Sequence, residues 1–170
     1  MRWHQFETLM FLTRSEEELP TGQLNYAHYK AIHHHFFQDV YNWAGCPRES
    51  RTAKNGNWFC YPEYIDTQME NIFEQLAAEH HLSNVESIVK FAERASYYVA
   101  EINGINPFRE GNGRCQLTLL SILFDVAGFV MNEDLLDPAE IMEAMIISFR
   151  GDNAPLARTI RAMSGPIRET

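Results

Sequence analysis

The decisive stretch of this chain is Asn103-Gly104-Ile105-Asn106-Pro107-Phe108-Arg109-Glu110-Gly111-Asn112-Gly113-Arg114. In it, Gly111 and Gly113 bracket an asparagine immediately before a predicted helix. Glycines allow backbone N–H groups to converge, and the N-terminus of a helix adds the positive end of its dipole. Together these groups can bind an anion such as a phosphate, and Arg114 can direct its guanidinium at that anion. Glu110 is placed to hold a magnesium ion that bridges phosphate oxygens. These residues predict a site for a di- or triphosphate; the alternative is an ordinary loop with Arg114 at the surface.

Helix signals flank this stretch on both sides. A helix is predicted from about Asn112 to Val126, ending at Gly128. Upstream, Ser83 and Glu86 form a capping box ahead of a further helix. Its apolar positions are Ile88, Val89, Ala92, Ala95 and Val99. Nearer the C-terminus, residues 137–140 (Asp-Pro-Ala-Glu) open a helix to about residue 149, and residues 153–155 (Asn-Ala-Pro) open a final one.

The N-terminal half shows one more helical stripe and then a change of pattern. Apolar and histidine positions recur every four residues at Leu24, His28, Ile32, Phe36 and Val40, which predicts a helix that ends before residues 43–45. Asn55-Gly56-Asn57 is a turn signal inside residues 48–61, which predicts a small β-hairpin with 58–61 as its second strand. Pro62 then opens a helix whose apolar residues are Ile65, Met69, Ile72, Phe73 and Leu76. The predicted fold class is all-α with one small hairpin.

Composition limits what else the chain can be. It has 170 residues, of which 45% are hydrophobic and 22% charged, and the formal net charge is −9. These values fit one soluble domain over residues 1–170. The acidic balance argues against a nucleic-acid-binding face, and no window is apolar enough to cross a membrane. Three cysteines without CxxC spacing favour a reducing compartment, so we expect a cytoplasmic protein.

The decisive stretch resembles the signature of the Fic family, His-x-Phe-x-Asp/Glu-Gly-Asn-Gly-Arg-x-x-Arg. The matching positions are Phe108, Glu110, Gly111, Asn112, Gly113 and Arg114. Residues 37–45, ending in Trp-Ala-Gly, resemble another part of the family pattern, and residues 51–65 resemble its flap hairpin. The likeness covers about residues 21–163. It implies the Fic fold, a compact domain of about seven helices with a hairpin flap beside the active-site loop.

The resemblance also implies an activity, the transfer of AMP from ATP to a Ser, Thr or Tyr hydroxyl of a target protein. The loop amides of Gly111, Asn112 and Gly113 would bind phosphates, with Arg114 stabilising their charge and Glu110 holding Mg²⁺. Phe108 would be a buried anchor of the loop. The flap residues Phe59, Cys60 and Tyr61 would pair with the target backbone as an added strand.

Two positions depart from the family signature. Asn106 stands in the catalytic position of the histidine that serves as general base, and an asparagine amide is not basic enough to accept the proton. A lost general base costs about 10²–10⁴-fold in rate. Asn106 is an inactivating change in a toxic enzyme, a natural degeneration or a sign of altered chemistry. Leu117 replaces the last arginine, which in the family contacts the γ-phosphate or an inhibitory glutamate, so the hold on the terminal phosphate is in doubt.

Other assignments remain open at this stage. The chain lacks the family's inhibitory pattern Ser/Thr-x-x-x-Glu-Gly/Asn, so inhibition would come from a small antitoxin-like partner or be absent. A non-catalytic nucleotide- or protein-binding module and another Fic-type phosphotransfer reaction are the alternative functions. Trp3 and Phe6 could support self-association, so we expect a monomer or a weak homodimer. His33-His34-His35 are consecutive on a helix and therefore cannot converge on one metal ion.

Overall fold

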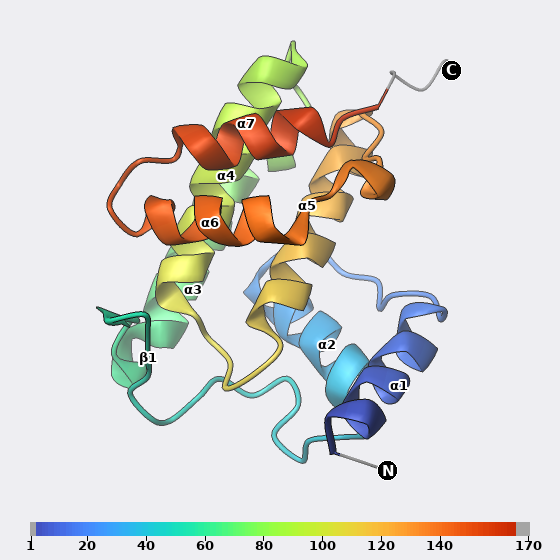
Figure 1. Cartoon of the computed structure of the whole chain (residues 1–170), viewed down its shortest axis with the longest axis vertical. Coiled ribbons are helices and arrows are strands. Elements are labelled where there is room, and N and C mark those ends of the chain that lie inside the picture. Colours follow the sequence, from blue (N-terminus) through green and yellow to red (C-terminus); the bar gives the residue numbers. More distant parts are fainter. Residues whose placement is uncertain (1–2, 166–170) are drawn as a thin grey trace.

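A computed structural model describes residues 3–165 and confirms the all-α class with a small hairpin (Figure 1). The α-helices are α1 (Trp3–Ser15), α2 (Tyr26–Phe37), α3 (Ile65–Ala78), α4 (Ile88–Ile105), α5 (Asn112–Ala127), α6 (Pro138–Ser148) and α7 (Ala154–Ala162). Short 3₁₀ helices are η1 (Pro62–Tyr64), η2 (His80–Leu82) and η3 (Glu133–Leu135). The strands β1 (Ala53–Lys54) and β2 (Asn57–Trp58) pair antiparallel. No helix in this described part is long and apolar enough to span a membrane.

Helix α4 lies at the centre of the fold and packs against α3, α5 and α7 (Figure 1). It can do so because its buried residues recur at three- and four-residue spacing and cover more than one face. These residues are Phe91, Ala92, Ala95, Ser96, Tyr98, Val99, Ile102 and Ile105. Helix α6 crosses in front of α4 and α5, and α1 packs on α2 at the opposite end of the molecule. The loop between α4 and α5 is thereby held at both ends by buried helices.

Several predicted helix boundaries are confirmed. Asp137 caps α6, where its Oδ1 accepts hydrogen bonds from the amides of Ala139 and Glu140 at 2.9 and 3.3 Å. Gly128 ends α5 with a φ of +81°, a backbone conformation that glycine adopts without strain. The apolar stripe predicted for α3 is buried throughout. Short-range capping and turn chemistry therefore placed most helices correctly.

The cap predicted at Ser83 was wrong, whereas Asn153 stands at the N-cap position of α7 as predicted. Ser83 does not open α4: its hydroxyl donates to the carbonyl of His80, and Ser87 caps the helix by accepting from the amide of Lys90 at 3.2 Å. Asn153 makes no capping bond with its side chain. The amide of Ala154 is instead bound by Asp152 Oδ1 at 3.0 Å. Helix α4 thus begins four residues later than the predicted cap, and at α7 the residue before Asn153 supplies the side-chain bond.

The stripe predicted for α2 was also partly wrong. Val40 lies beyond the end of the helix, and His28 binds the preceding turn, accepting from the Leu24 amide through Nδ1 and donating to the Pro20 carbonyl through Nε2. Residues buried on α2 are Tyr26, Tyr29, Ile32, His33, Phe36 and Phe37. The buried face is therefore shifted around the helix from the predicted one, and it includes a histidine.

Helix α1 was not predicted. None of its residues is fully buried, and its sequence shows no clear apolar stripe that would have predicted a helix. It is held against α2 by Phe11, whose ring centroid lies 4.9 Å from that of Phe36, and by an ion pair between Arg14 and Asp39 at 2.6 Å. This helix places its acidic residue Glu7 beside the start of α5.

The hairpin is shorter than predicted. Its turn is Asn55-Gly56, with φ angles of +52° and +76°, as a type I′ turn requires. Strand β2 ends at Trp58, so residues 59–61 lie beyond the paired segment. The hairpin extends from the body beside the loop between α4 and α5 (Figure 1).

Candidate functional site

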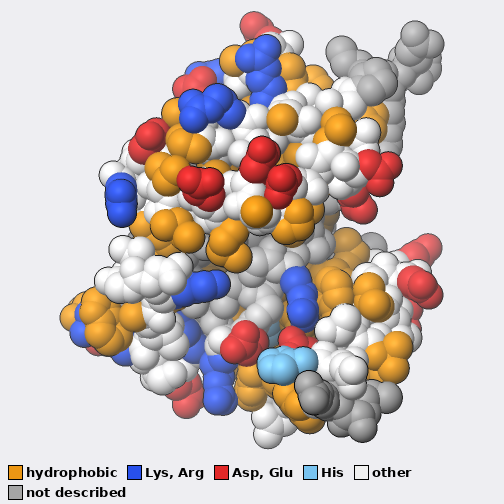
Figure 2. Space-filling view, in the orientation of Figure 1, with side chains coloured by type: hydrophobic (Ala, Val, Ile, Leu, Met, Phe, Trp, Pro, Cys, Tyr) orange, Lys and Arg blue, Asp and Glu red, His pale blue; other side chains and the backbone are white. Residues whose placement is uncertain are grey.

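A cavity of about 650 Å³ lies between the hairpin, the start of α5 and helix α6, within the size range of small-molecule sites. Figure 2 shows the hollow below a band of apolar side chains, with Lys and Arg side chains around it. One wall is apolar and comes from Ile141, Met142, Met145, Ile146 and Phe149. The opposite side is polar and is built by the loop of residues 106–114 and by the hairpin. A ligand with an apolar ring and a charged tail would fit a cavity with one apolar wall and one polar wall.

The loop that forms the polar side is rigidly braced. Phe108 is completely buried, with its ring centroid 3.8 Å from the His33 ring, which confirms it as the anchor of the loop. Asn112 closes the loop: its Oδ1 accepts from the Phe108 amide at 2.9 Å, and its Nδ2 donates to the Phe108 carbonyl at 2.7 Å. Both polar atoms of the Asn112 side chain therefore help to fix the loop.

The first turn of α5 presents unsatisfied amides. The first helical bond runs from the Cys115 amide to the Gly111 carbonyl at 3.1 Å, so the N–H groups of residues 112–114 have no acceptor within the helix. Gly111 has a φ of +81°, and a Cβ atom there would lie 2.4 Å from the ring of Phe37. Glycine is therefore required for the chain to turn into the helix. Open amides at a helix N-terminus suit an anion, which is the ligand that the sequence predicts here.

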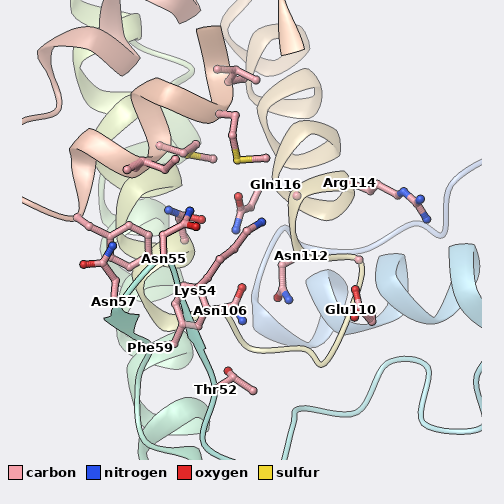
Figure 3. Close-up of a pocket in the computed structure, with 18 of the residues that line it drawn as sticks. Thr52, Lys54, Asn55, Asn57, Phe59, Asn106, Glu110, Asn112, Arg114 and Gln116 are labelled. Atoms are coloured by element: carbon pink, nitrogen blue, oxygen red, sulfur yellow. The ribbon is translucent and has the colours of Figure 1, made fainter. Parts of the chain in front are cut away.

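Asn106 ends α4 in the left-handed conformation, with φ +50° and ψ +66°, and lines the cavity. Asparagine tolerates this conformation better than most residues. Figure 3 shows its side chain on the cavity side of the loop, near Asn112. The residue in the predicted general-base position thus faces the site, but it carries an amide.

Glu110 lies exposed at the rim of the same cavity, and within residues 3–165 its carboxylate has no ion pair. No group of three or more possible metal-ligating side chains occurs in the described part of the chain. Mg²⁺ is commonly held by one or two carboxylates together with the phosphates of a substrate. Glu110 fits that mode beside the amides of α5.

Arg114 is not directed at the anion site. Its guanidinium binds the carboxylate of Glu7 at 3.0 Å and lies over the rings of Phe11 and Phe37, at 4.8 and 5.6 Å from their centres. Figure 3 shows the side chain pointing away from Asn106 and Asn112. The sequence predicts that this arginine stabilises phosphate charge, and the structure places it in an ion pair with α1. Glu7 and burial also raise the pKa of the nearby Tyr41 to about 12.

The predicted flap residues occupy different environments. Phe59 is buried and lines the cavity, and its amide donates to the Thr52 carbonyl at 3.1 Å. The Cys60 amide donates to Gly104 at 3.3 Å, whereas Tyr61 is exposed on the outer side. Because two of these amides are engaged, they cannot pair with an added strand. Ala53 stands in a non-hydrogen-bonded pair of the hairpin, so its backbone polar groups point to the outer edge of β1.

Arg48 is a structural residue of the site that sequence reasoning missed. It is only 2% exposed, and its guanidinium donates to four main-chain carbonyls. These carbonyls belong to Asn106, Ser50, Cys60 and Ile105. Burial lowers the pKa of Arg48, and the carbonyls at the negative end of α4 stabilise its charge. Arg48 thereby links the loop of residues 106–114 to the hairpin. No local sequence signal identifies this residue.

His33 supports the loop from behind. Its Nε2 donates to the carbonyl of Glu110 at 2.9 Å, and its Nδ1 accepts from the amide of Gly45 at 2.8 Å. Burial lowers its pKa to about 4, so the ring is neutral at physiological pH. His34 and His35 bind two other carbonyls, those of Ala44 and Arg14. The three histidines therefore serve separate structural contacts.

Comparison with known proteins places this site in a family. The model of the Fic/DOC family matches residues 23–124. A probable protein adenylyltransferase, y4lH of Sinorhizobium fredii, is 55% identical over 159 residues, which cover 94% of this chain and 83% of that protein. Protein adenylyltransferase VbhT of Bartonella schoenbuchensis is 35% identical over 141 residues, covering 83% of this chain but only 29% of VbhT.

Solved structures show the same fold. The BepC protein of Bartonella tribocorum with bound AMPPNP has a TM-score of 0.88 at 19% identity and covers 98% of this chain and 88% of its own. A Fic domain of Bartonella quintana with bound ADP has a TM-score of 0.87 at 20% identity, with 98% and 86% covered. Family match, curated relatives and fold agree with the loop geometry described above. The chain belongs to the Fic/DOC family.

Proposed function

We propose that this protein is a Fic-type protein adenylyltransferase that binds ATP in the cavity and, with Asn106 in place of a general base, transfers AMP slowly. The observation that carries the proposal is the cluster of open amides at the start of α5 beside Glu110 and opposite the apolar wall of α6. The amides suit the phosphates, and the apolar wall suits a purine base. The names of the relatives, and the nucleotides in two structures of the same fold, support this choice.

In the proposed reaction a target hydroxyl attacks the α-phosphorus of ATP. The new bond forms between that oxygen and phosphorus, the bond to the β-phosphate oxygen breaks, and pyrophosphate leaves. The amides of residues 112–114 stabilise the negative charge, and Glu110 would hold Mg²⁺, which would supply further positive charge. Ala53, on the outer edge of β1, is placed to hold the target chain as an added strand. The target is a protein with an accessible Ser, Thr or Tyr hydroxyl.

The hydroxyl proton has no basic acceptor at position 106. The Asn106 amide can orient the attacking hydroxyl but cannot remove its proton, which passes to solvent water instead. We therefore expect a rate lower by about 10²–10⁴-fold than that of the same site with histidine. The open amides of α5 and Glu110 remain beside the cavity, so we expect the side chain at position 106 to be the main cause of the low rate.

The test is AMP transfer from ATP labelled at the α-phosphate, with Mg²⁺ and a cell lysate as the source of targets. Asn106→His is expected to label itself or a target strongly, while the unchanged protein labels weakly or not at all. Asn103→His is the matched control, because Asn103 also lines the cavity but ends no helix in the left-handed conformation. Equal labelling by both histidine variants, or none by Asn106→His, would contradict the proposal.

A second candidate is a non-catalytic nucleotide-binding module. It is favoured by the pairing of Arg114 with Glu7, which occupies a charge that would otherwise be available to a phosphate. ATP binding by the unchanged protein, with no transfer by Asn106→His, would select it. A small inhibitory partner would act on either form, and its presence can be tested by co-purification from the native source.

A further inference from the structure

Gln116 presents an unpaired polar group to the cavity. The residue is only 2% exposed, and its Nε2 has no hydrogen-bond partner. A buried donor left unpaired costs about 1–3 kcal/mol, so most such groups in folded proteins have an acceptor. Gln116 lines the cavity, and Figure 3 shows its amide directed into it. The site therefore contains a donor for a ligand that the reasoning from the signature did not use.

The position of Gln116 relates it to the anion site. It follows Asn112 by four residues on α5, so the two side chains lie on the same helix face, about 6 Å apart along the axis. Its donor thus lies one turn deeper in the cavity than the first-turn amides. A ligand group bound there would extend from the start of α5 along the helix.

Lys54 enters the same space from the hairpin. Figure 3 shows its side chain running from β1 into the cavity with its end toward Gln116. Among residues 3–165 it has no ion pair, whereas the other two basic residues that line the cavity have contacts elsewhere. Arg114 binds Glu7, and the Arg109 guanidinium lies over the Trp43 ring at 5.2 Å. The Lys54 ammonium and the unpaired Gln116 Nε2 are both hydrogen-bond donors, so an acceptor placed between them can bind to both.

We propose that Lys54 and Gln116 together bind phosphate oxygens of the nucleotide beyond the phosphate held by the α5 amides. The inference rests on the proposed function and names two residues that select the length of the phosphate chain. An anionic oxygen satisfies both groups at once, because it accepts from the amide and neutralises the ammonium. Leu117, the next residue on α5, has no polar atom to contribute. The charge that holds the terminal phosphates therefore comes from the hairpin.

The test is calorimetric binding of ATP, AMP and inorganic tripolyphosphate, each with Mg²⁺, to the unchanged protein and to Lys54→Met and Gln116→Met. Each variant is expected to weaken ATP and tripolyphosphate by about tenfold and AMP by less than about twofold. The double variant should lose less than the product of the two single losses, because both residues hold one group. Lys90→Met is the control for charge, since Lys90 is exposed and paired with Glu93 on α4.

Thermal unfolding separates this role from a structural one. Gln116→Met removes an unpaired buried amide and keeps the volume, so its melting temperature should stay equal or rise while ATP binding weakens. Gln75→Met is the matched case, because it removes the acceptor of the Tyr97 hydroxyl and should lower the melting temperature.

Each other outcome is decisive. Unchanged ATP binding in both variants, or an equal loss for AMP and ATP, overturns the inference while the proposed function stands. If the unchanged protein binds tripolyphosphate through Lys54 and Gln116 but binds no ATP, the proposed function fails and the phosphate site stands. If it binds neither, both fail.

Discussion

The carboxylate of Glu7 lies 3.0 Å from the guanidinium of Arg114, so the first helix supplies the counter-ion of the arginine in the glycine-rich loop. Glu7 is the more buried partner, at 13% side-chain exposure against 37% for Arg114. The rings of Phe11 and Phe37 lie beneath the guanidinium and hold it on the α1 side of the loop. A phosphate in the cavity must therefore compete with Glu7 for this charge.

Glu7→Gln should increase the affinity for ATP by about two- to fivefold, because Arg114 loses its ionic partner and becomes available to a phosphate. Calorimetric titration with ATP and Mg²⁺ measures the change. Glu17→Gln is the control, since Glu17 pairs with Arg14 on the outer side of the fold and should leave ATP binding unaltered. Weaker binding in Glu7→Gln would show that the ion pair helps to shape the site.

Gly111→Ala should destabilise the protein by about 2 kcal/mol, because the new methyl group would meet Phe37 and the positive φ is strained for alanine. Gly113→Ala is the matched control. It lies in the same turn, has open space around its Cβ position and should be neutral or slightly stabilising through helix propensity. Urea denaturation of both variants tests the difference, and equal stabilities would refute the packing argument.

Arg48→Met should cost about 3 kcal/mol or more of folding free energy, because four main-chain carbonyls lose their donor in a buried place. Arg48→Lys should rescue little, since one ammonium cannot reproduce the geometry of the guanidinium fork. Arg51→Lys, on the hairpin surface over Trp58 and Tyr61, should change stability by less than about 1 kcal/mol. Denaturant midpoints of the three variants would settle the order, and a stable Arg48→Met would contradict it.

Stability should fall as the pH is lowered from about 6.5 to 4, because of His33. In the folded state burial lowers its pKa to about 4, whereas the ordinary value is 6.5. Above pH 6.5 the ring is neutral in both the folded and the unfolded state, so its titration does not change the free energy of unfolding. Below it the unfolded chain binds a proton that the folded chain does not, so folding loses up to about 3 kcal/mol. Urea denaturation across this range should show a smaller slope in His33→Gln than in the unchanged protein, and an equal slope would exclude His33 as the cause.

The glycine-rich loop and most helix ends were predictable because their causes are local. Gly111 must turn the chain within one residue, and Asp137 caps amides two and three positions away. Phe108 could be recognised as an anchor from the pattern around it. The wrong cap at Ser83 and the missing side-chain bond of Asn153 show the limit of local signals, since Ser87 and Asp152 nearby are equally good capping residues and only the folded geometry selects among them.

The supporting residues of the site were not predictable in this way. His33 reaches Glu110 across 77 residues, Arg48 reaches Asn106 across 58, and Glu7 reaches Arg114 across 107. No short pattern marks any of them, because each contact exists only after α1, α2 and the hairpin have packed around the loop. The same holds for Gln116 and Lys54, which line one cavity from different elements.

The sequence by itself determined the helical class and the glycine turn into α5, since these depend on residue types within a few positions of one another, and its resemblance to a family signature marked position 106. The tertiary structure alone decided where the charges act. It turned Arg114 toward Glu7, buried Arg48 among carbonyls and brought Lys54 opposite Gln116. The reason is physical: caps and turns are set by bonds along a short chain segment, whereas ion pairs and buried donors depend on which distant segments the packed core brings into contact.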